Sequence, residues 1–168
     1  MTVRAAIFNA NSAFARKPFL EISEKEWDEG FITAVKAAYN FSSAVLPLLS
    51  LAKDKQGEKN DLPPPTLIFT GATASLKGSA NTSVFASTKF AVRALNQSLA
   101  REYGPKGVHV AHVIIDGVID IPRTKAWELP EGGKLDPNAI AETYWNLHAQ
   151  PATAWTWEQD LRPSIEKL

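Results

Sequence analysis

The sequence predicts an α/β fold in which long helices cover a parallel β-sheet, in a single domain that spans residues 1–168. Short apolar runs of strand length alternate along the chain with longer segments whose apolar residues recur at helical spacing. The first two runs are nearly continuous, as in strands that are buried on both faces of a parallel sheet. Such alternation favours right-handed strand–helix–strand crossovers. With 45% hydrophobic residues, the chain can bury one core.

Four apolar runs are predicted to be strands, and they cover residues 3–8, 66–70, 108–115 and 154–161. The segments between them connect the strands. Residues 52–65 are polar and end in three prolines, so an exposed loop is expected there. A second loop is expected over residues 121–135, which contain two prolines and a Gly-Gly pair.

The first helix is predicted to begin after Ser23, which stands three residues before Glu26 at the spacing of a capping box. Its apolar residues form one stripe that is expected to face the sheet. This stripe consists of Trp27, Phe31, Val35, Ala38 and Tyr39.

Two further helices are predicted by their start and stop signals. One runs from about residue 83 to Tyr103, where Gly104-Pro105 ends it. The other begins at Asp136-Pro137, a capping residue followed by proline at the first helical position, and ends before Pro151.

Composition narrows the functions that are expected. Eighteen basic and eighteen acidic residues cancel, so no net charge favours nucleic acid or anionic lipid as a partner. The chain has no cysteine, which excludes disulfides and thiolate metal sites. Its first residues contain no apolar secretion segment, and no apolar run approaches membrane-spanning length. A soluble, cytoplasmic protein that does not bind membranes is therefore expected.

Several segments, in order, resemble the short-chain dehydrogenase/reductase family over nearly the whole chain. They are 7–11, 17–23, 44–49, the segment Ser83-Val84-Phe85-Ala86-Ser87-Thr88-Lys89-Phe90-Ala91, and 99–110. The resemblance implies a partial Rossmann-like sheet that corresponds to the family's strands four to seven, with long crossover helices. The family's first βαβαβ portion, including the glycine-rich turn that cradles the cofactor phosphates, is absent from this sequence. The resemblance implies NAD or NADP as cofactor.

The family's catalytic positions, carried over residue by residue, are largely replaced. Lys89 stands at the lysine position, whereas Phe85 occupies the place of the tyrosine that donates the proton. Ala72 occupies the serine position and Ala34 the asparagine position. Phenylalanine has no proton to donate and alanine no hydrogen bond, so these residues cannot perform the family's acid catalysis.

The resemblance implies cofactor contacts from Asn9, Lys89 and Gly117. Gly117 also has a purely structural interpretation, because Asp116-Gly117 is a turn signal. Asp116 and Asp120 are spaced so that they can flank a cleft.

No metal site is expected, because His109 and His112 lie three apart on a strand and face opposite sides of the sheet. His148 is interpreted as a surface or capping residue near a helix end. Trp155 and Trp157 are predicted to share one face of the last strand.

Three interpretations remain open: an NAD(P)-dependent oxidoreductase of the family, a non-catalytic pseudoenzyme or interaction subunit, and a truncated fragment. The second interpretation implies a homo-oligomer or a related partner that packs against the two long helices. Small and apolar residues of the second helix would supply that surface, namely Ala86, Phe90, Val92, Ala94 and Leu99. In addition, the first strand would be an exposed apolar edge, which favours association.

Overall fold

We analysed a computed structural model of the chain, which describes residues 2–12, 16–55 and 62–166. A four-stranded parallel sheet with the order β1-β2-β3-β6 forms its centre. The strands are β1 (Ala5–Phe8), β2 (Thr66–Ala72), β3 (His109–Ile115) and β6 (Glu158–Leu161). The α/β class and the parallel sheet predicted from the sequence are therefore confirmed.

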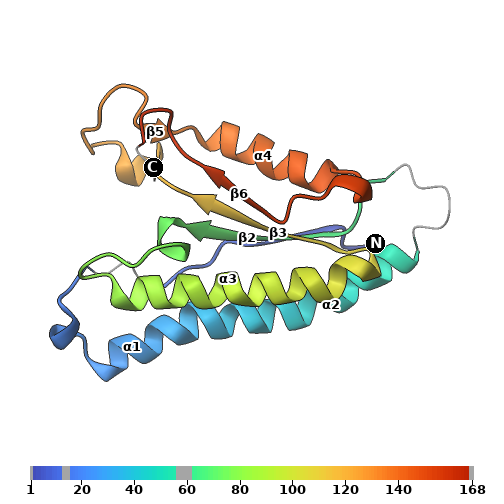
Figure 1. The fold of residues 1–168 in the computed structure, drawn as a ribbon, viewed down its shortest axis with the longest axis horizontal. Coiled ribbons are helices and arrows are strands. Elements are labelled where there is room, and N and C mark those ends of the chain that lie inside the picture. Colours follow the sequence, from blue (N-terminus) through green and yellow to red (C-terminus); the bar gives the residue numbers. More distant parts are fainter. Residues whose placement is uncertain (1, 13–15, 56–61, 167–168) are drawn as a thin grey trace.

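Long helices cover one face of the sheet and a single helix covers the other (Figure 1). On the first face, α1 (Glu24–Phe31) continues through a π-helical turn (Ile32–Lys36) into α2 (Ala37–Asp54), and α3 (Ser83–Tyr103) lies beside them. On the second face lies α4 (Pro137–Ala149). The carboxyl ends of all four strands point to the same edge, where ligand sites of open α/β sheets occur.

The connections contain short elements. The strand β4 (Val118–Ile119) pairs with β5 (Lys134–Leu135), so both ends of the loop predicted over 121–135 are tied together. The described residues also form five 3₁₀ turns: Phe19–Glu21, Thr73–Ser75, Gly104–Lys106, Pro122–Thr124 and Ala152–Ala154.

Helix starts agree with the signals in the sequence. The backbone N–H of Glu26 donates to Ser23 Oγ, and the Glu26 carboxylate accepts from the Ser23 backbone, which completes the predicted capping box. Lys17 Nζ lies 2.7 Å from the same carboxylate. The hydrogen bonds from Lys17 and Ser23 lower the pKa of Glu26 to about 2. At the other confirmed start, the Asp136 side chain accepts from Asn138 and caps α4.

The two faces of the sheet are packed unequally. Between the sheet and α2 and α3, Phe8 contacts Phe69 and Phe41 with ring centroids 5.7 and 5.6 Å apart. On the α4 face the core is smaller and surrounds Leu147. Beside α4 an apolar groove of about 700 Å³ runs over β1 and β2, and Ile7, Ile68 and Tyr144 are among its lining residues.

Several predictions about burial were wrong. Strand β1 is not buried on both faces: it alternates between exposed and buried residues, because α4 does not reach over it. The prediction that β1 is an exposed apolar edge is confirmed, since β1 lies at the edge of the sheet and Ile7 is 48% exposed. Tyr39 points to solvent, although it belongs to the predicted apolar stripe. Ala86 and Val92 face the core, so they cannot form a partner surface, whereas Phe90 on the same helix is exposed.

Three further predictions need correction or qualification. The last strand begins at Glu158, not near residue 154, and the predicted loop at 52–65 begins only after Asp54, where α2 ends. Residues 56–61 of that loop lie outside the described residues. The continuous helical segment Glu24–Asp54 is long and apolar enough to cross a membrane by length and composition. Its Leu46 and Leu49 pack in the core against the sheet.

We predict that the chain associates through the exposed apolar side of β1, because parallel edges with apolar side chains pair or pack with other chains. Ile7→Lys places a charge on that side and should shift sedimentation velocity profiles toward monomer. Leu20→Lys is the matched control, since Leu20 is 94% exposed in the turn Phe19–Glu21 and should leave the profile unchanged. A wild-type chain that sediments as a monomer at micromolar concentration would contradict the prediction.

Candidate functional site

A polar cleft lies where the carboxyl ends of β2 and β3 meet the start of α3. It has a volume of about 420 Å³. Ala72 comes from the end of β2, Phe85 from the first turn of α3, and Ile115, Asp116 and Gly117 from the end of β3. Its other lining residues are Arg16, Thr73, Ala74, Lys77, Ser79, Thr82 and Glu166. The fold thus brings together Phe85 and Ala72, which the sequence assigned to the tyrosine and serine positions.

Ala34, at the predicted asparagine position, is separate from this cleft. It lies inside the π-helical turn Ile32–Lys36, and only 2% of its surface is exposed. π-Helical turns inside α-helices are frequent at functional sites. Here, however, the residue at the centre of the turn is a buried methyl group, which cannot hydrogen-bond.

Lys89 lies one helical turn beyond Phe85 and points toward the sheet. Its Nζ donates to the backbone oxygen of Thr70 over 3.1 Å, and it lies 5.9 Å from the centre of the Phe85 ring. The side chain is nearly buried, with 6% of the residue exposed. This burial lowers the pKa of Lys89 to about 8. Lys89 does not line the cleft.

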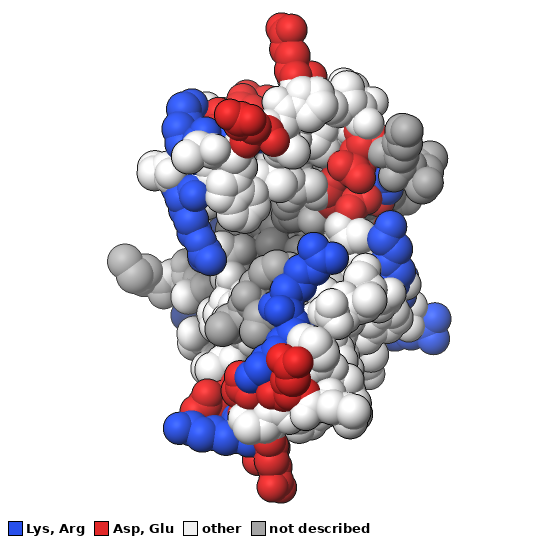
Figure 2. All heavy atoms as spheres, turned by 90° about the vertical axis from the view of Figure 1, so that its left-hand side faces the viewer, with Lys and Arg blue, Asp and Glu red and all other residues white. Residues whose placement is uncertain are grey.

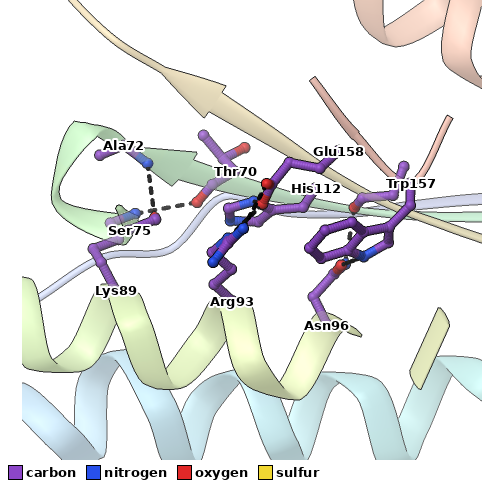
Figure 3. Close-up of polar contacts among 10 residues, drawn as sticks. Thr70, Ala72, Ser75, Lys89, Arg93, Asn96, His112, Trp157 and Glu158 are labelled. Atoms are coloured by element: carbon purple, nitrogen blue, oxygen red, sulfur yellow. Dashed lines mark hydrogen bonds and ion pairs between the residues drawn. The ribbon is translucent and has the colours of Figure 1, made fainter. Parts of the chain in front are cut away.

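Lys89 begins a row of polar residues on the buried side of α3, which continues with Arg93 and Asn96 (Figure 3). Arg93 holds the Glu158 carboxylate with two hydrogen bonds, Nε–Oε2 at 2.6 Å and Nη2–Oε1 at 2.7 Å. Asn96 donates to the backbone oxygen of Ala111 and accepts from the indole of Trp157. We call Lys89, Arg93 and Asn96 the α3 polar row.

Glu158 also accepts from His112 Nδ1 over 2.9 Å. Burial lowers the pKa of His112 in spite of this carboxylate, which favours the neutral ring. For Glu158, burial acts in the opposite direction, but the hydrogen bonds from Arg93 and His112 prevail and lower its pKa. Nε2 of His112 has no hydrogen-bond partner among the described residues. It lies against Gly71, where a Cβ atom would be only 2.4 Å away, so the close approach requires glycine.

The structure adds a polar pair that the sequence did not single out as a unit. Thr73 Oγ1 donates to Asp116 Oδ1 inside the cleft, beside Ala72 and Phe85. Arg162 Nη2 approaches the other oxygen of Asp116 at 3.5 Å. The sequence allowed Asp116 and Asp120 to flank a cleft, although it favoured Asp116-Gly117 as a turn, and Asp116 does line this cleft. Asp120 lines a different cavity, near Trp127 and Gly133.

The residues implied to hold a dinucleotide do not assemble into one pocket. Asn9 lines the apolar groove beside α4, Gly117 lines the cleft, and Lys89 lines neither. Gly117 packs against Pro163, which would be 2.7 Å from an added Cβ, so its small size serves chain packing. The described residues therefore do not fit a dinucleotide in the manner that the family resemblance implies.

The histidines have structural roles. His109 and His112 face opposite sides of β3 as predicted: His109 stacks on Trp155, with centroids 4.9 Å apart, and His112 faces α3. His148 was expected at the surface, but it is only 9% exposed and its Nδ1 bonds Thr66 Oγ1. Among residues 2–12, 16–55 and 62–166, no group of three or more potential ligand side chains could hold a metal ion.

Trp155 and Trp157 were predicted to share one face of the last strand, but they do not. Both precede β6. Trp155 packs on His109 and donates to the Gln150 backbone after α4, whereas Trp157 reaches Asn96 on α3. The two indoles therefore hold the segment before β6 against the end of α4 on one face of the sheet and against α3 on the other.

Comparisons with known proteins agree with this fold. A family model described as short chain dehydrogenase matches residues 3–130. An uncharacterized oxidoreductase of Staphylococcus epidermidis is 27% identical over 139 residues, which cover 83% of this chain and 56% of the relative. A second uncharacterized oxidoreductase, from Staphylococcus aureus strain N315, is 24% identical over 94% of this chain and 63% of the relative. The chain thus spans a little over half the length of these curated relatives.

Solved structures give the same result. A short-chain dehydrogenase from Rhodopseudomonas palustris has a TM-score of 0.73 and 34% identity, over 95% of this chain and 62% of that one. An alcohol dehydrogenase from Thermococcus sibiricus in complex with 5-hydroxy-NADP has a TM-score of 0.79, at 23% identity over 99% of this chain and 66% of that one. The latter likeness shows the fold alone.

Removing Arg93 should destabilise the fold, because it leaves the partly buried Glu158 without its cation. We expect Arg93→Met to lower the free energy of unfolding by about 2–3 kcal/mol in urea titrations. Lys106→Met is the matched control, since the exposed pair of Lys106 with Glu102 is worth only about 0.3–0.5 kcal/mol. Equal losses in the two variants would show that the Arg93–Glu158 contact does not stabilise the fold.

Lys89 should give stability a distinct pH dependence. Its pKa of about 8 in the folded chain lies below the ordinary 10.5, so the unfolded chain binds more protons between these two values. Stability should therefore rise with pH through this window and be lost as pH falls through 8. Relative to Lys89→Met, the wild-type free energy of unfolding should rise by about 2–4 kcal/mol across it. If urea titrations showed that the free energy of unfolding changes with pH equally in the wild-type chain and in Lys89→Met, they would contradict the burial of a charged Lys89.

Proposed function

Because the chain belongs to the short chain dehydrogenase family, we propose that it is a pseudoenzyme of that family: its cleft binds a small ligand, but it does not reduce carbonyls by the family's tyrosine-dependent route. The observation that carries the proposal is the position of Phe85. It lines the cleft beside Ala72, so the two side chains nearest the expected reaction centre are a hydrocarbon ring and a methyl group.

Carbonyl reduction requires a group that donates a proton to the substrate oxygen, and losing such a group typically costs about 10²–10⁴-fold in rate. Neither Phe85 nor Ala72 can donate one. The hydroxyl groups that line the cleft belong to Thr73, Ser79 and Thr82. The proton of Thr73 is directed to Asp116 and that of Thr82 to the backbone oxygen of Ser79. An aliphatic alcohol is also a much weaker acid than a phenol. Lys89 has no phenol whose pKa it could lower, and its Nζ is directed to the Thr70 carbonyl.

The cleft itself persists without this chemistry. Its walls come from the ends of β2 and β3 and the start of α3, which the sheet and the α3 polar row hold in place. Small-molecule sites of open α/β sheets occur at this edge of the sheet. This placement supports ligand binding as the retained part of the family's function.

A second candidate function is an interaction subunit. On the outer side of the long helices, Leu48, Leu51 and Phe90 are exposed. These large apolar side chains favour packing against another protein through α2 and α3. This surface and the cleft are separate, so both functions are compatible.

The proposal predicts no turnover with nicotinamide cofactors. Wild-type chain and the Phe85→Tyr/Ala72→Ser variant, mixed with millimolar NADH or NADPH and a panel of aldehydes and ketones, should show no loss of reduced cofactor above background. Calorimetric titration with the same cofactors should show no binding by either chain. Turnover by the wild-type chain would refute the pseudoenzyme assignment. Turnover by the variant alone would support the pseudoenzyme assignment of the wild-type chain. It would contradict the expectation that neither chain binds the cofactor.

A further inference from the structure

We propose that the cleft binds a neutral polyhydroxylated ligand of monosaccharide size, a sugar or a polyol, with the Thr73–Asp116 pair as its polar anchor. This inference rests on the proposed function, since it names the class of ligand for the same cleft. Four features of the lining support this ligand class: the carboxylate of Asp116, the hydroxyl of Thr73, the ring of Phe85 and the balance of charge.

Asp116 has hydrogen-bonding capacity to spare. A carboxylate accepts about four hydrogen bonds. Thr73 Oγ1 occupies one site on Oδ1, and Arg162 approaches Oδ2 at 3.5 Å, beyond ordinary hydrogen-bond length. The Thr73 and Arg162 contacts fix the orientation of the carboxylate, while its remaining lone pairs can accept two neighbouring hydroxyl groups of one ligand. Thr73 Oγ1, whose proton is engaged, is itself an acceptor for a further hydroxyl.

Phe85 supplies the apolar part of the site. Its half-buried ring lies in the same wall as Ala72 and Ile115. A sugar ring or a polyol chain carries hydroxyl groups on its edge and C–H groups on its face, so it can pack the C–H face on an aromatic ring while its edge bonds the polar anchor.

The charges in the cleft are balanced. Two lining residues, Arg16 and Lys77, are basic and two, Asp116 and Glu166, are acidic, and Arg162 approaches Asp116 from outside the lining. Figure 2, which views this edge of the sheet, shows Lys and Arg side chains around the central hollow, with Asp and Glu side chains nearby. A balanced lining gives no preference for a strongly charged ligand, but it offers both donors and acceptors, as hydroxyl groups require. The volume of about 420 Å³ lies in the lower range for small-molecule sites.

The test is a titration of ¹⁵N-labelled chain with D-glucose, D-galactose and D-mannitol, followed by amide chemical shifts and without any cofactor. D-gluconate is the charged probe and cyclohexanol the probe with a single hydroxyl. We expect saturable shifts at residues 72–77 and 115–117 with at least one of the neutral polyols, and weaker binding of the other two probes. No saturable shifts with any polyol, or tighter binding of gluconate or cyclohexanol than of every polyol, would overturn the inference.

Variants separate the anchor from general effects on the fold. Thr73→Val removes the hydroxyl that orients Asp116 and should weaken polyol binding about tenfold, the loss expected for one charge-assisted hydrogen bond. Thr143→Val is the matched control, because Thr143 lies on α4 with its hydroxyl bonded to Ala139, and it should leave binding unchanged. Phe85→Leu tests the ring independently and should also weaken binding about tenfold. Unchanged affinity in either cleft variant would overturn the assigned binding mode.

These measurements are distinct from the turnover assay. If polyols fail to bind while the chain stays inactive with cofactor, the ligand class is wrong and the pseudoenzyme proposal stands. If the wild-type chain turns over carbonyls, the pseudoenzyme proposal fails whatever the polyol titration shows.

Discussion

The position of α3 on the sheet is the constraint on which the cleft depends. The α3 polar row reaches three strands at once: Lys89 bonds β2, Asn96 bonds β3, and Arg93 holds Glu158 on β6. Apolar attraction is non-directional and constrains the rotation of a helix only weakly. A buried polar group destabilises the fold unless its hydrogen-bond partner is in place. The row therefore fixes the rotation of α3, and with it the position of Phe85 one turn earlier.

This constraint gives Lys89 a structural role beside Phe85. Burial lowers the pKa of Lys89, which means that the protonated form is held against a cost in free energy. Because Phe85 is not a phenol whose pKa Lys89 could lower, a catalytic role of Lys89 would not offset that cost. Its bond to the Thr70 carbonyl gives Lys89 a structural role at the end of β2, where the wall of the cleft begins. The same structural logic applies to Gly71, which leaves room for the ring of His112.

The sequence predicted the layers well and the interior polar contacts poorly. Alternating apolar runs and helix caps located β2, α3 and α4 almost to the residue, because those signals are local. The polar row was missed, although Lys89, Arg93 and Asn96 stand at helical spacing on one stripe, because such residues usually mark a solvated face. Their partners, Glu158 above all, are distant in sequence, so only the fold could show that this stripe is buried. His148 was misplaced for the same reason: its partner, Thr66, is 82 residues away.

In the proposed function, the fold retains a binding site while the chemistry of that site differs from the family's. The location of the cleft is set by backbone, namely the common edge where β2 and β3 end, and substitutions at Phe85 and Ala72 leave that edge intact. What happens to a bound molecule is set by side chains, and here Phe85, at the position predicted for the family's proton donor, lines the cleft together with the carboxylate of Asp116. Family membership therefore indicates where a ligand binds, whereas the residues that line the cleft decide which ligand binds and whether it reacts. In the function proposed for this chain, they recognise hydroxyl groups and do not transfer a proton to a carbonyl.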